Sequence, residues 1–426
     1  MNPALTKPPF PLREAHCHLA AHGRALSMLR LDGCTSAEEC IERLREDAAR
    51  TSAAWVLAIG ARVESWREPR WPTRTELDRV GRPCCVMSFD HHAVAANTEA
   101  FEASGLLHGA SPPGGVICRD ASGDPSGVVL EAAAHQVWNA APGPTDVEQR
   151  EFVRTGAKDL FQHGFTEVHD LLSPLWLGPI LGALDRAGEL PLSVHMYVPV
   201  EDVEAQHRGA VAWQSPRVRL AGAKVFADGT LNSRTAWMLS PYSDPLPGLE
   251  RGKVITPPPN IRQARERSLA LGLGLAVHAI GDAAVRAVLE AERDIQRARG
   301  RPAVPLRIEH CELIDRTDVS RFAELGAVAS VQPCHLLVDF EVLTRQLPHR
   351  LDRVLPLREL VDAGLVPGRT LIFGSDTPIV RPHPQDSIHA AVHRRRAGMK
   401  VEEAIAPAQA ISEREAWAAF SATEPR

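Results

Sequence analysis

The chain has 426 residues, of which 44% are hydrophobic, so it can bury a large core. This length exceeds that of a typical single domain, with the α/β barrel as the main exception. A formal net charge of −5 argues against nucleic acid or an anionic membrane surface as a partner. No stretch approaches the roughly 18 consecutive apolar residues of a transmembrane helix, so we expect a soluble cytoplasmic protein.

The eight cysteines lack the spacing of a disulfide framework, which favours reduced thiols in an intracellular protein. Residues 1–12 contain four prolines and no apolar segment of signal-peptide length. We interpret the basic run at 394–396 as a solvated helix face rather than a binding patch. The expected partner is therefore a small-molecule substrate.

The stretch Glu14-Ala15-His16-Cys17-His18 contains two histidines separated by one residue. Side chains alternate between the two faces of a β-strand, so His16 and His18 point to one side and Cys17 to the other. A pair of imidazoles at a strand end is a starting point for a metal site, although two polar residues near a turn would look the same.

A long irregular region follows this first strand. The segment that begins at Ser36 has the sequence of a capping box and predicts a helix with Ile41 and Leu44 on one face. Residues 51–145 then hold short strand-like runs among Gly and Pro, and we interpret them as an insertion that faces the substrate. We expect residues 1–426 to form a single barrel that carries 51–145 as an inserted subdomain.

From residue 145 onwards, strand-like and helix-like segments alternate. Further strands are predicted at 165–171, 190–198, 218–228, 273–282, 306–312, 327–335 and 370–377, and helical patterns separate most of them. With the strand near Glu14 the count reaches eight. Eight β/α units predict a (β/α)₈ TIM barrel more readily than an open sheet.

The active site of such a barrel lies at the carboxyl ends of its strands. Those predicted ends carry four histidines, a lysine and an aspartate: His16, His18, Lys224, His278, His310 and Asp376. An imidazole-rich set of this kind suits one or two divalent metals, with zinc as the first choice and iron, manganese or nickel as alternatives. Any one of the six is as easily a structural polar residue, but all six together point to a shared site.

Lys224 is the unusual member of the set, because a protonated amine cannot bind a metal and is repelled by a dication. Addition of CO₂ to its nitrogen would give a carbamate that bridges two metals as a carboxylate does. The alternative is a lysine held away from the metal by a carboxylate such as Asp228.

Several ordered motifs resemble the amidohydrolase superfamily, and within it the amidohydrolase-3 branch that includes N-substituted formamide deformylases. They extend from residue 14 to about residue 420 and comprise 16–18, 90–97, 127–131, 163–170, 224–235, 277–282, 307–310, 331–335 and 374–378. The resemblance implies five metal ligands: His16, His18, His278, His310 and Asp376. It also implies a carboxylated Lys224, with Asp376 acting in addition as the proton shuttle.

One feature departs from that family pattern. Members of this branch usually carry a β-sandwich built from residues before and after the barrel, whereas here the histidine pair already stands at residue 16. We therefore expect the sandwich to be absent. The surface that it covers in relatives would then form a contact in a homo-oligomer.

The implied reaction is hydrolysis of a C–N bond in a non-peptide amide by a metal-activated hydroxide, with Asp376 passing the proton to the leaving nitrogen. His335 and one of His91 and His92 are candidates for the donor that meets the oxyanion, and each is as readily a packing residue. Arg234 is a candidate for binding an anionic part of the substrate, or else for a salt bridge within its own loop.

Two further positions have weaker interpretations. Asp282 either orients an imidazole or caps a helix. Glu309 and Cys311 flank His310 and are expected to point outward, away from the chemistry.

Other functions fit the same set of residues. These are ester or lactone hydrolysis, a non-hydrolytic isomerisation or decarboxylation, or a metal-free scaffold subunit. The sequence does not name the substrate, and we expect specificity to lie in residues 60–145 and 229–259.

Overall fold

The computed structural model describes residues 10–422, which divide into two compact units. The first unit comprises the described residues up to Gly23 and those from Arg150 onwards, and the second comprises Arg24–Gln149. The chain therefore leaves the first unit shortly after its first strand and returns to it in a later helix. The second unit contains the predicted insertion 51–145 together with the residues from Arg24.

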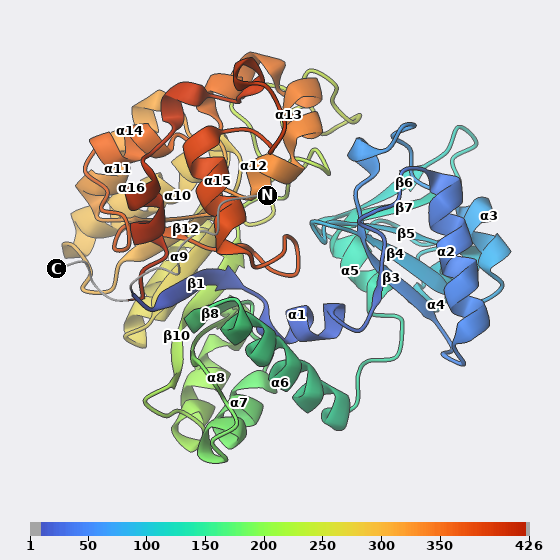
Figure 1. The fold of residues 1–426 in the computed structure, drawn as a ribbon, viewed down its shortest axis with the longest axis horizontal. Helices are drawn as coiled ribbons and strands as arrows, with labels where there is room; N and C mark the ends of the chain where they lie inside the picture. The colour runs from blue at the N-terminus through green and yellow to red at the C-terminus, as the bar shows by residue number, and fades with distance from the viewer. Residues whose placement is uncertain (1–9, 423–426) are drawn as a thin grey trace. The chain divides into compact units, whose positions relative to one another are not determined.

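Eight parallel strands form the sheet of the first unit, in the order β1-β8-β9-β10-β11-β12-β13-β14 (Figure 1). Their bounds are Leu12–Cys17, Phe165–Leu171, Ser193–Pro199, Val218–Phe226, Gly274–Ala279, Leu306–His310, Val328–Val331 and Leu371–Phe373. The backbone N–H of His18 donates to the carbonyl of Thr377 at 2.9 Å, and that of Asp376 donates to the carbonyl of His16 at 2.7 Å. These bonds join the first strand to the segment after the last one, and the predicted (β/α)₈ TIM barrel is confirmed.

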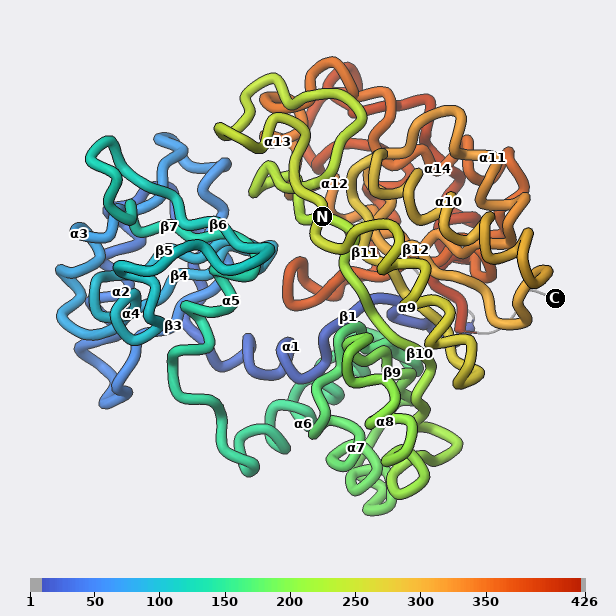
Figure 2. Tube along the Cα trace, turned by 180° about the vertical axis from the view of Figure 1, so that it is seen from behind, coloured from blue at the N-terminus to red at the C-terminus, as the bar shows by residue number. Residues whose placement is uncertain are grey.

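Helices alternate with the strands of the barrel. They include α6 (Asp146–Gln162), α7 (Leu177–Arg186), α8 (Val203–Gly209), α9 (Pro258–Ala270), α10 (Asp282–Arg299), α11 (Arg316–Leu325), α12 (His335–Val338), α13 (Phe340–Gln346), α14 (Leu357–Asp362), α15 (Pro384–His393) and α16 (Glu413–Ala419). In the view from behind, α9 and α10 lie next to each other along β10 and β11 (Figure 2). α10 buries Val285, Val288 and Leu289, the apolar spacing of an amphipathic helix.

A six-stranded mixed sheet forms the centre of the second unit, in the order β2-β3-β4-β5-β7-β6. In that order its strands are Leu29–Arg30, Val56–Ala61, Cys84–Ser88, Ala93–Ala96, Pro125–Glu131 and Gly115–Arg119. α2 (Ala37–Arg50) begins after Ser36, whose side chain accepts the backbone N–H of Glu39, and it buries Ile41 and Leu44 against β3 and β4. α4 (Thr98–Ser104) and α5 (Ala132–Trp138) belong to a separate apolar cluster. Alternate residues of β4 enter the two clusters, which therefore lie on opposite faces of the sheet.

The basic run at the end of α15 is not a solvated face, so that expectation was wrong. Arg394 is only 1% exposed, and its guanidinium donates to the carbonyls of Ile405 (3.1 Å) and Val354 (2.6 Å). Backbone carbonyls left unpaired near helix ends can satisfy a buried guanidinium, and a charge pattern does not reveal them.

The eight cysteines are free thiols, as expected. Within residues 10–422, no helix combines the length and the apolar composition needed to cross a membrane.

Candidate metal centre

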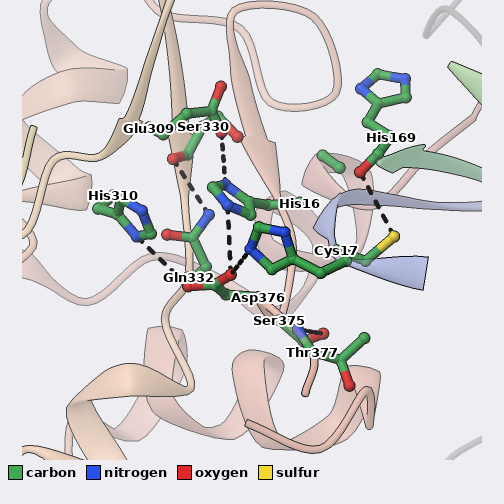
Figure 3. A network of polar contacts seen from close by, with 12 residues as sticks. His16, Cys17, His169, Glu309, His310, Ser330, Gln332, Ser375, Asp376 and Thr377 are labelled. Carbon is green, nitrogen blue, oxygen red and sulfur yellow. Dashed lines mark hydrogen bonds and ion pairs between the residues drawn. The ribbon is translucent and has the colours of Figure 1, made fainter. Parts of the chain in front are cut away.

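Imidazole and carboxylate side chains meet where β1 ends and the segment after β14 begins (Figure 3). Oδ1 of Asp376 lies 3.3 Å from Nε2 of His16 and 3.0 Å from Nε2 of His18. Ligand-type atoms of His16, His310 and Asp376 all lie within 4.8 Å of one another. The structure thus brings four of the residues predicted at strand ends into one cluster.

His310 and His278 come from the neighbouring strands β12 and β11, and their ring centroids are 4.4 Å apart. Nδ1 of His310 faces Oδ2 of Asp376 at 4.0 Å. Nε2 of His278 lies 3.1 Å from the carbonyl oxygen of Gly229. A carbonyl can only accept, so Nε2 of His278 donates this hydrogen bond. Nδ1 is the nitrogen of His278 that would hold a cation.

Lys224 lies near the end of β10 and is buried, with 2% of its surface exposed. Burial lowers the pKa of its ammonium to about 8, against the opposing effect of the carboxylates of Glu309 and Asp376. Its Nζ lies 5.2 Å from the ring centroid of Phe226. Because Lys224 also acts electrostatically on His16, it belongs to the same buried cluster of charges.

Asp228 is the carboxylate that would hold Lys224 away from a metal. Its carboxylate accepts backbone N–H groups from Trp237 (2.8 Å), Ile280 (3.0 Å) and Gly281 (2.8 Å). Its Oδ1 also lies 3.7 Å from Nε2 of His278. These contacts tie the loop after β10 to the end of β11 and steady the surroundings of that imidazole.

Gly374 allows β1 and the segment after β14 to approach each other closely. A Cβ at this position would lie 2.5 Å from Oε1 of Glu14 and 2.5 Å from the backbone nitrogen of His16. Oε1 of Glu14 fills that space and accepts the backbone N–H groups of His16 (3.0 Å) and Ser375 (2.9 Å). Asp376 has a left-handed backbone, with a φ of 62°, which these contacts and its own N–H bond to β1 hold in place.

Glu309 lies inside the barrel, so the expectation that it points outward was wrong. It is fully buried, and its Oε2 lies 2.8 Å from Nδ1 of His16, while its Oε1 accepts from Nε of Arg307 at 2.9 Å. The backbone explains the error, because His310 and Cys311 have φ values of 71° and 49°. The regular alternation of strand side chains ends at Glu309, so Glu309 and His310 both reach the site.

Burial keeps the imidazoles of His16 and His310 neutral. It lowers the pKa of His16 to about 4, and it lowers the pKa of His310 well below its ordinary value, with His278 adding to the effect. Burial by itself would raise the pKa of Asp376, but the imidazoles of His16 and His18 outweigh it and the net pKa is lowered. Neutral imidazoles beside an ionised carboxylate are the protonation states that metal ligands require.

One of the converging atoms lacks a partner, and another faces two imidazoles. Nδ1 of His310 is buried and makes no hydrogen bond among the described residues, and Oδ1 of Asp376 lies 3.0 Å from Nε2 of His18 and 3.3 Å from Nε2 of His16. Buried polar atoms without partners are uncommon and usually mark a bound water, an ion or a functional site. The donor set of imidazole nitrogens and a carboxylate oxygen therefore fits a divalent cation, and zinc prefers such ligands.

His335 begins α12, just after β13, and faces the same carboxylate. Its Nε2 lies 4.0 Å from Oδ2 of Asp376, and its Nδ1 lies 3.0 Å from Oε1 of Glu312. Burial lowers the pKa of His335, but the hydrogen bond and charge of Glu312 outweigh it and raise the pKa to about 9. Nε2 is buried without a hydrogen-bond partner in the described part of the chain. The structure thus places an N–H donor beside the cluster.

Arg234 and Asp282 make contacts within the loops of the barrel. Arg234 donates from Nε to the carbonyl of Asp244 at 2.8 Å and from Nη2 to its carboxylate at 3.0 Å. Asp282 accepts the backbone N–H of Leu239 at 2.8 Å and pairs with Arg350. These contacts agree with the interpretation of Arg234 as a residue that forms a salt bridge within its own loop. Asp282 stands at the start of α10 and holds the long loop after β10.

His91 and His92 belong to the second unit. His91 has a left-handed backbone with a φ of 61°, and its N–H donates to the carbonyl of Ser88 at 3.1 Å. Nδ1 of His92 lies 2.7 Å from Oε2 of Glu131. The carboxylate fixes the ring of His92, and a role in substrate binding stays a prediction for both histidines.

Three buried residues of the site escaped the sequence analysis: Glu14, Arg307 and Glu312. A signal existed for Glu14, because strand alternation places it on the face of His16 and His18. A sequence signal also existed for Arg307, since two charges at positions 307 and 309 of an apolar strand indicate a polar inner face. No sequence signal pointed to Glu312, because it follows His310 and Cys311, whose left-handed backbone breaks the alternation of strand side chains.

Comparison with known proteins agrees with this geometry. A profile described as the amidohydrolase family matches residues 11–424. The chain belongs to the amidohydrolase family. The resemblance noted in the sequence is therefore confirmed, and family membership makes the protein a hydrolase.

Individual relatives show the same relationship. YtcJ of Bacillus subtilis, whose name assigns it to the amidohydrolases, is 29% identical over 407 residues, which cover 93% of this chain and 74% of the relative. The N-substituted formamide deformylase of Arthrobacter pascens is 27% identical over 382 residues, covering 84% and 68% of the two chains. The crystal structure of an uncharacterized metal-dependent hydrolase from Pyrococcus horikoshii superposes with a TM-score of 0.75 at 26% identity, covering 96% of this amidohydrolase and 79% of that chain.

Proposed function

We propose that this amidohydrolase is a metal-dependent enzyme that cleaves the C–N bond of a non-peptide amide, with Asp376 as its proton carrier. The observation that carries the proposal is the convergence of Asp376 with the imidazoles of His16, His18 and His310. Similarity to a protein described as a metal-dependent hydrolase, and to one that deformylates N-substituted formamides, supports it.

One or two divalent cations, with zinc as the first choice, would be held by the imidazoles and the carboxylate of the cluster together with a modified lysine: His16, His18, His278, His310, Asp376 and Lys224. When bound, such a cation acidifies a water molecule to a pKa of about 7 and polarises the scissile carbonyl. The chain's own residues provide the remaining steps.

Asp376 carries the proton from the attacking water to the leaving nitrogen. One of its oxygens faces His16 and His18, and the other lies 4.0 Å from His310 and 4.0 Å from His335. The carboxylate therefore spans the cluster, and its two oxygens face different imidazoles. A carboxylate in this position can take a proton at one oxygen and pass it to a leaving nitrogen.

His335 donates to the carbonyl oxygen of the substrate as negative charge develops there. Glu312 holds the ring through Nδ1, which leaves Nε2 directed at the cluster with no partner among the described residues. The raised pKa of about 9 keeps a proton on Nε2. A preorganised donor of this kind stabilises the transition state more than the ground state.

Lys224 reacts with CO₂ through its neutral amine. A new N–C bond forms, one proton leaves the nitrogen, and the product is a carbamate with the charge and shape of a carboxylate. The burial of Lys224 beside the cluster supports this modification, because a carbamate there would pair with the cations rather than repel them.

Substrate contacts by Arg234, His91 and His92 complete the proposal. Arg234 is 14% exposed at its side chain and already pairs with Asp244, so an anionic substrate group would have to share or replace that carboxylate. His91 and His92 are the candidates for substrate contacts among the residues of the second unit.

The test is a substrate panel with enzyme reconstituted with zinc. The panel contains N-alkyl formamides, simple amides, N-acyl amino acids and cyclic imides, with lactones and esters for comparison. We expect release of an amine from at least one C–N substrate, and loss of that activity in Asp376→Asn. Turnover confined to lactones or esters would contradict the C–N assignment.

A further inference from the structure

A row of buried polar contacts runs inside the barrel from the metal centre to β8. Nδ1 of His16 lies 2.8 Å from Glu309, and the other oxygen of Glu309 lies 2.9 Å from Nε of Arg307. Nη1 of Arg307 lies 2.6 Å from Nδ1 of His169, and Nε2 of His169 lies 3.2 Å from Glu167. The row joins β1, β12 and β8, strands that are far apart in the sequence, and its members beyond His16 have no role in the proposed reaction.

The guanidinium fixes the direction of each hydrogen bond in this row. Arginine has donors only, so Nδ1 of His169 accepts and its Nε2 carries the proton that faces Glu167. Nε of Arg307 donates to one oxygen of Glu309 at 2.9 Å and Nη2 donates to the other at 3.3 Å, and a carboxylate paired at both oxygens with a guanidinium is ionised. An ionised carboxylate can only accept, so Nδ1 of His16 must donate.

We infer that Glu309 is a positioning residue, held in place by Arg307, that fixes the tautomer and ring orientation of His16 so that the Nε2 lone pair faces the metal. This inference rests on the proposed metal centre. A neutral imidazole has one proton, and Glu309 keeps it on Nδ1. Nε2, which lies 3.3 Å from Asp376, is then free of hydrogen and available as a ligand.

Arg307 is itself fixed from several directions. Nη2 donates to the carbonyl of Ala15 at 2.8 Å and to Oγ of Ser330 at 3.1 Å, and the guanidinium lies 4.9 Å from the ring centroid of Tyr197. It therefore links β1, β9, β12 and β13 around the carboxylate. Since arginine does not release its proton in proteins, the row orients groups and does not conduct protons.

The residues at the far end of the row are of the types that bind metals, but the protonation state of His169 is not that of a metal ligand. Ligand-type atoms of Glu167, His169 and His195 lie within 4.8 Å of one another. Because Arg307 occupies Nδ1 of His169, the remaining nitrogen bears hydrogen and cannot bind a cation. These residues instead end the row that supports His16.

The experiment compares Co²⁺ binding by the full chain and its variants through competition with a chromophoric chelator, together with the visible spectrum of the bound Co²⁺. The test variants are Glu309→Gln and Glu309→Asp. Glu309→Asp keeps the charge that pairs with Arg307, but its shorter side chain moves the carboxylate away from His16. The matched control is Glu312→Gln, which removes an equally buried carboxylate from His335, a histidine outside the proposed ligand set. His16→Ala shows the effect of losing the ligand itself.

Both Glu309 variants should bind Co²⁺ about 10- to 100-fold more weakly than the unmodified chain, with a shifted spectrum, whereas Glu312→Gln should stay within about twofold. Should Glu309→Gln fail to fold because Arg307 loses its counter-charge, Glu309→Asp decides the matter alone. Affinity in Glu309→Asp equal to that of the unmodified chain would overturn the inference while leaving the metal centre intact. Absence of binding by the unmodified chain, or binding unaffected by His16→Ala, would overturn both.

Discussion

Gly374→Ala tests whether the backbone around the cluster is as tightly packed as its contacts indicate. The added Cβ would meet Oε1 of Glu14 and the backbone nitrogen of His16 at 2.5 Å each, and Cβ of His16 at 2.8 Å. Each 2.5 Å contact must lengthen by about 0.9 Å to reach the ordinary distance of 3.4 Å. Two of the three atoms belong to the main chain or Cβ of His16, so rotation of a side chain cannot relieve the clash. Overpacking of this kind costs about 1–3 kcal/mol.

The assay has two readouts for Gly374→Ala. The apparent melting temperature should fall by roughly 1–2 °C for each kcal/mol lost, and Co²⁺ affinity should fall at least about tenfold because His16 is displaced from the metal. Gly209→Ala is the matched control, because Gly209 ends α8 and an added Cβ would meet nothing within 4 Å. Alanine is the better helix former, so the control should melt at the same temperature or slightly higher. If Gly374→Ala matched the control in both readouts, the argument from close packing would be refuted.

The remaining predictions concern the chemistry. Lys224→Ala should lower the zinc content from two per chain toward one by elemental analysis, and an unchanged content would remove the bridging carbamate. Asp376→Asn should lower kcat by about 10²- to 10⁴-fold while the circular dichroism spectrum stays unchanged. A near-normal rate would exclude the proton-carrier role. His335→Gln should lower kcat by about 10²- to 10³-fold without changing metal content, and an effect on metal content alone would make it a ligand instead. Removal of zinc with a chelator should lower the melting temperature, because a ligand at 100 times its Kd adds about 2.7 kcal/mol of stability, and an unchanged melting temperature would argue against a tightly bound ion.

The barrel was predictable because its strands and helices alternate and each carries its own periodicity. β8 has the predicted bounds, Phe165–Leu171, since Gly164 precedes it and its apolar residues Phe165, Val168 and Leu171 are buried. The start of the second unit was harder to predict. α2 has a clear apolar face at Ile41 and Leu44, but the face alone does not say which sheet it covers, and the structure packs it on β3 and β4.

The convergence of site residues was predictable wherever regular strand geometry holds. His16 and His18 approach the same carboxylate oxygen because one residue separates them on an extended chain. That Glu309 and its neighbour His310 both face inward could not be predicted, because the left-handed backbone of His310 and Cys311 is invisible in a pattern of apolar and polar residues. Contacts between distant segments, such as the bonds from Arg307 to Ala15 and Ser330, depend on barrel closure rather than on local sequence.

The most direct measurement is anomalous diffraction at the zinc edge from crystals of the full chain soaked in zinc. We predict a peak about 2.0–2.2 Å from Nε2 of His16, Nε2 of His18 and a carboxylate oxygen of Asp376. A second peak is predicted near Nδ1 of His278, next to His310 and a carbamate on Lys224. A map with no peak at the end of β1, or with zinc bound only elsewhere on the protein, would contradict the proposed metal centre.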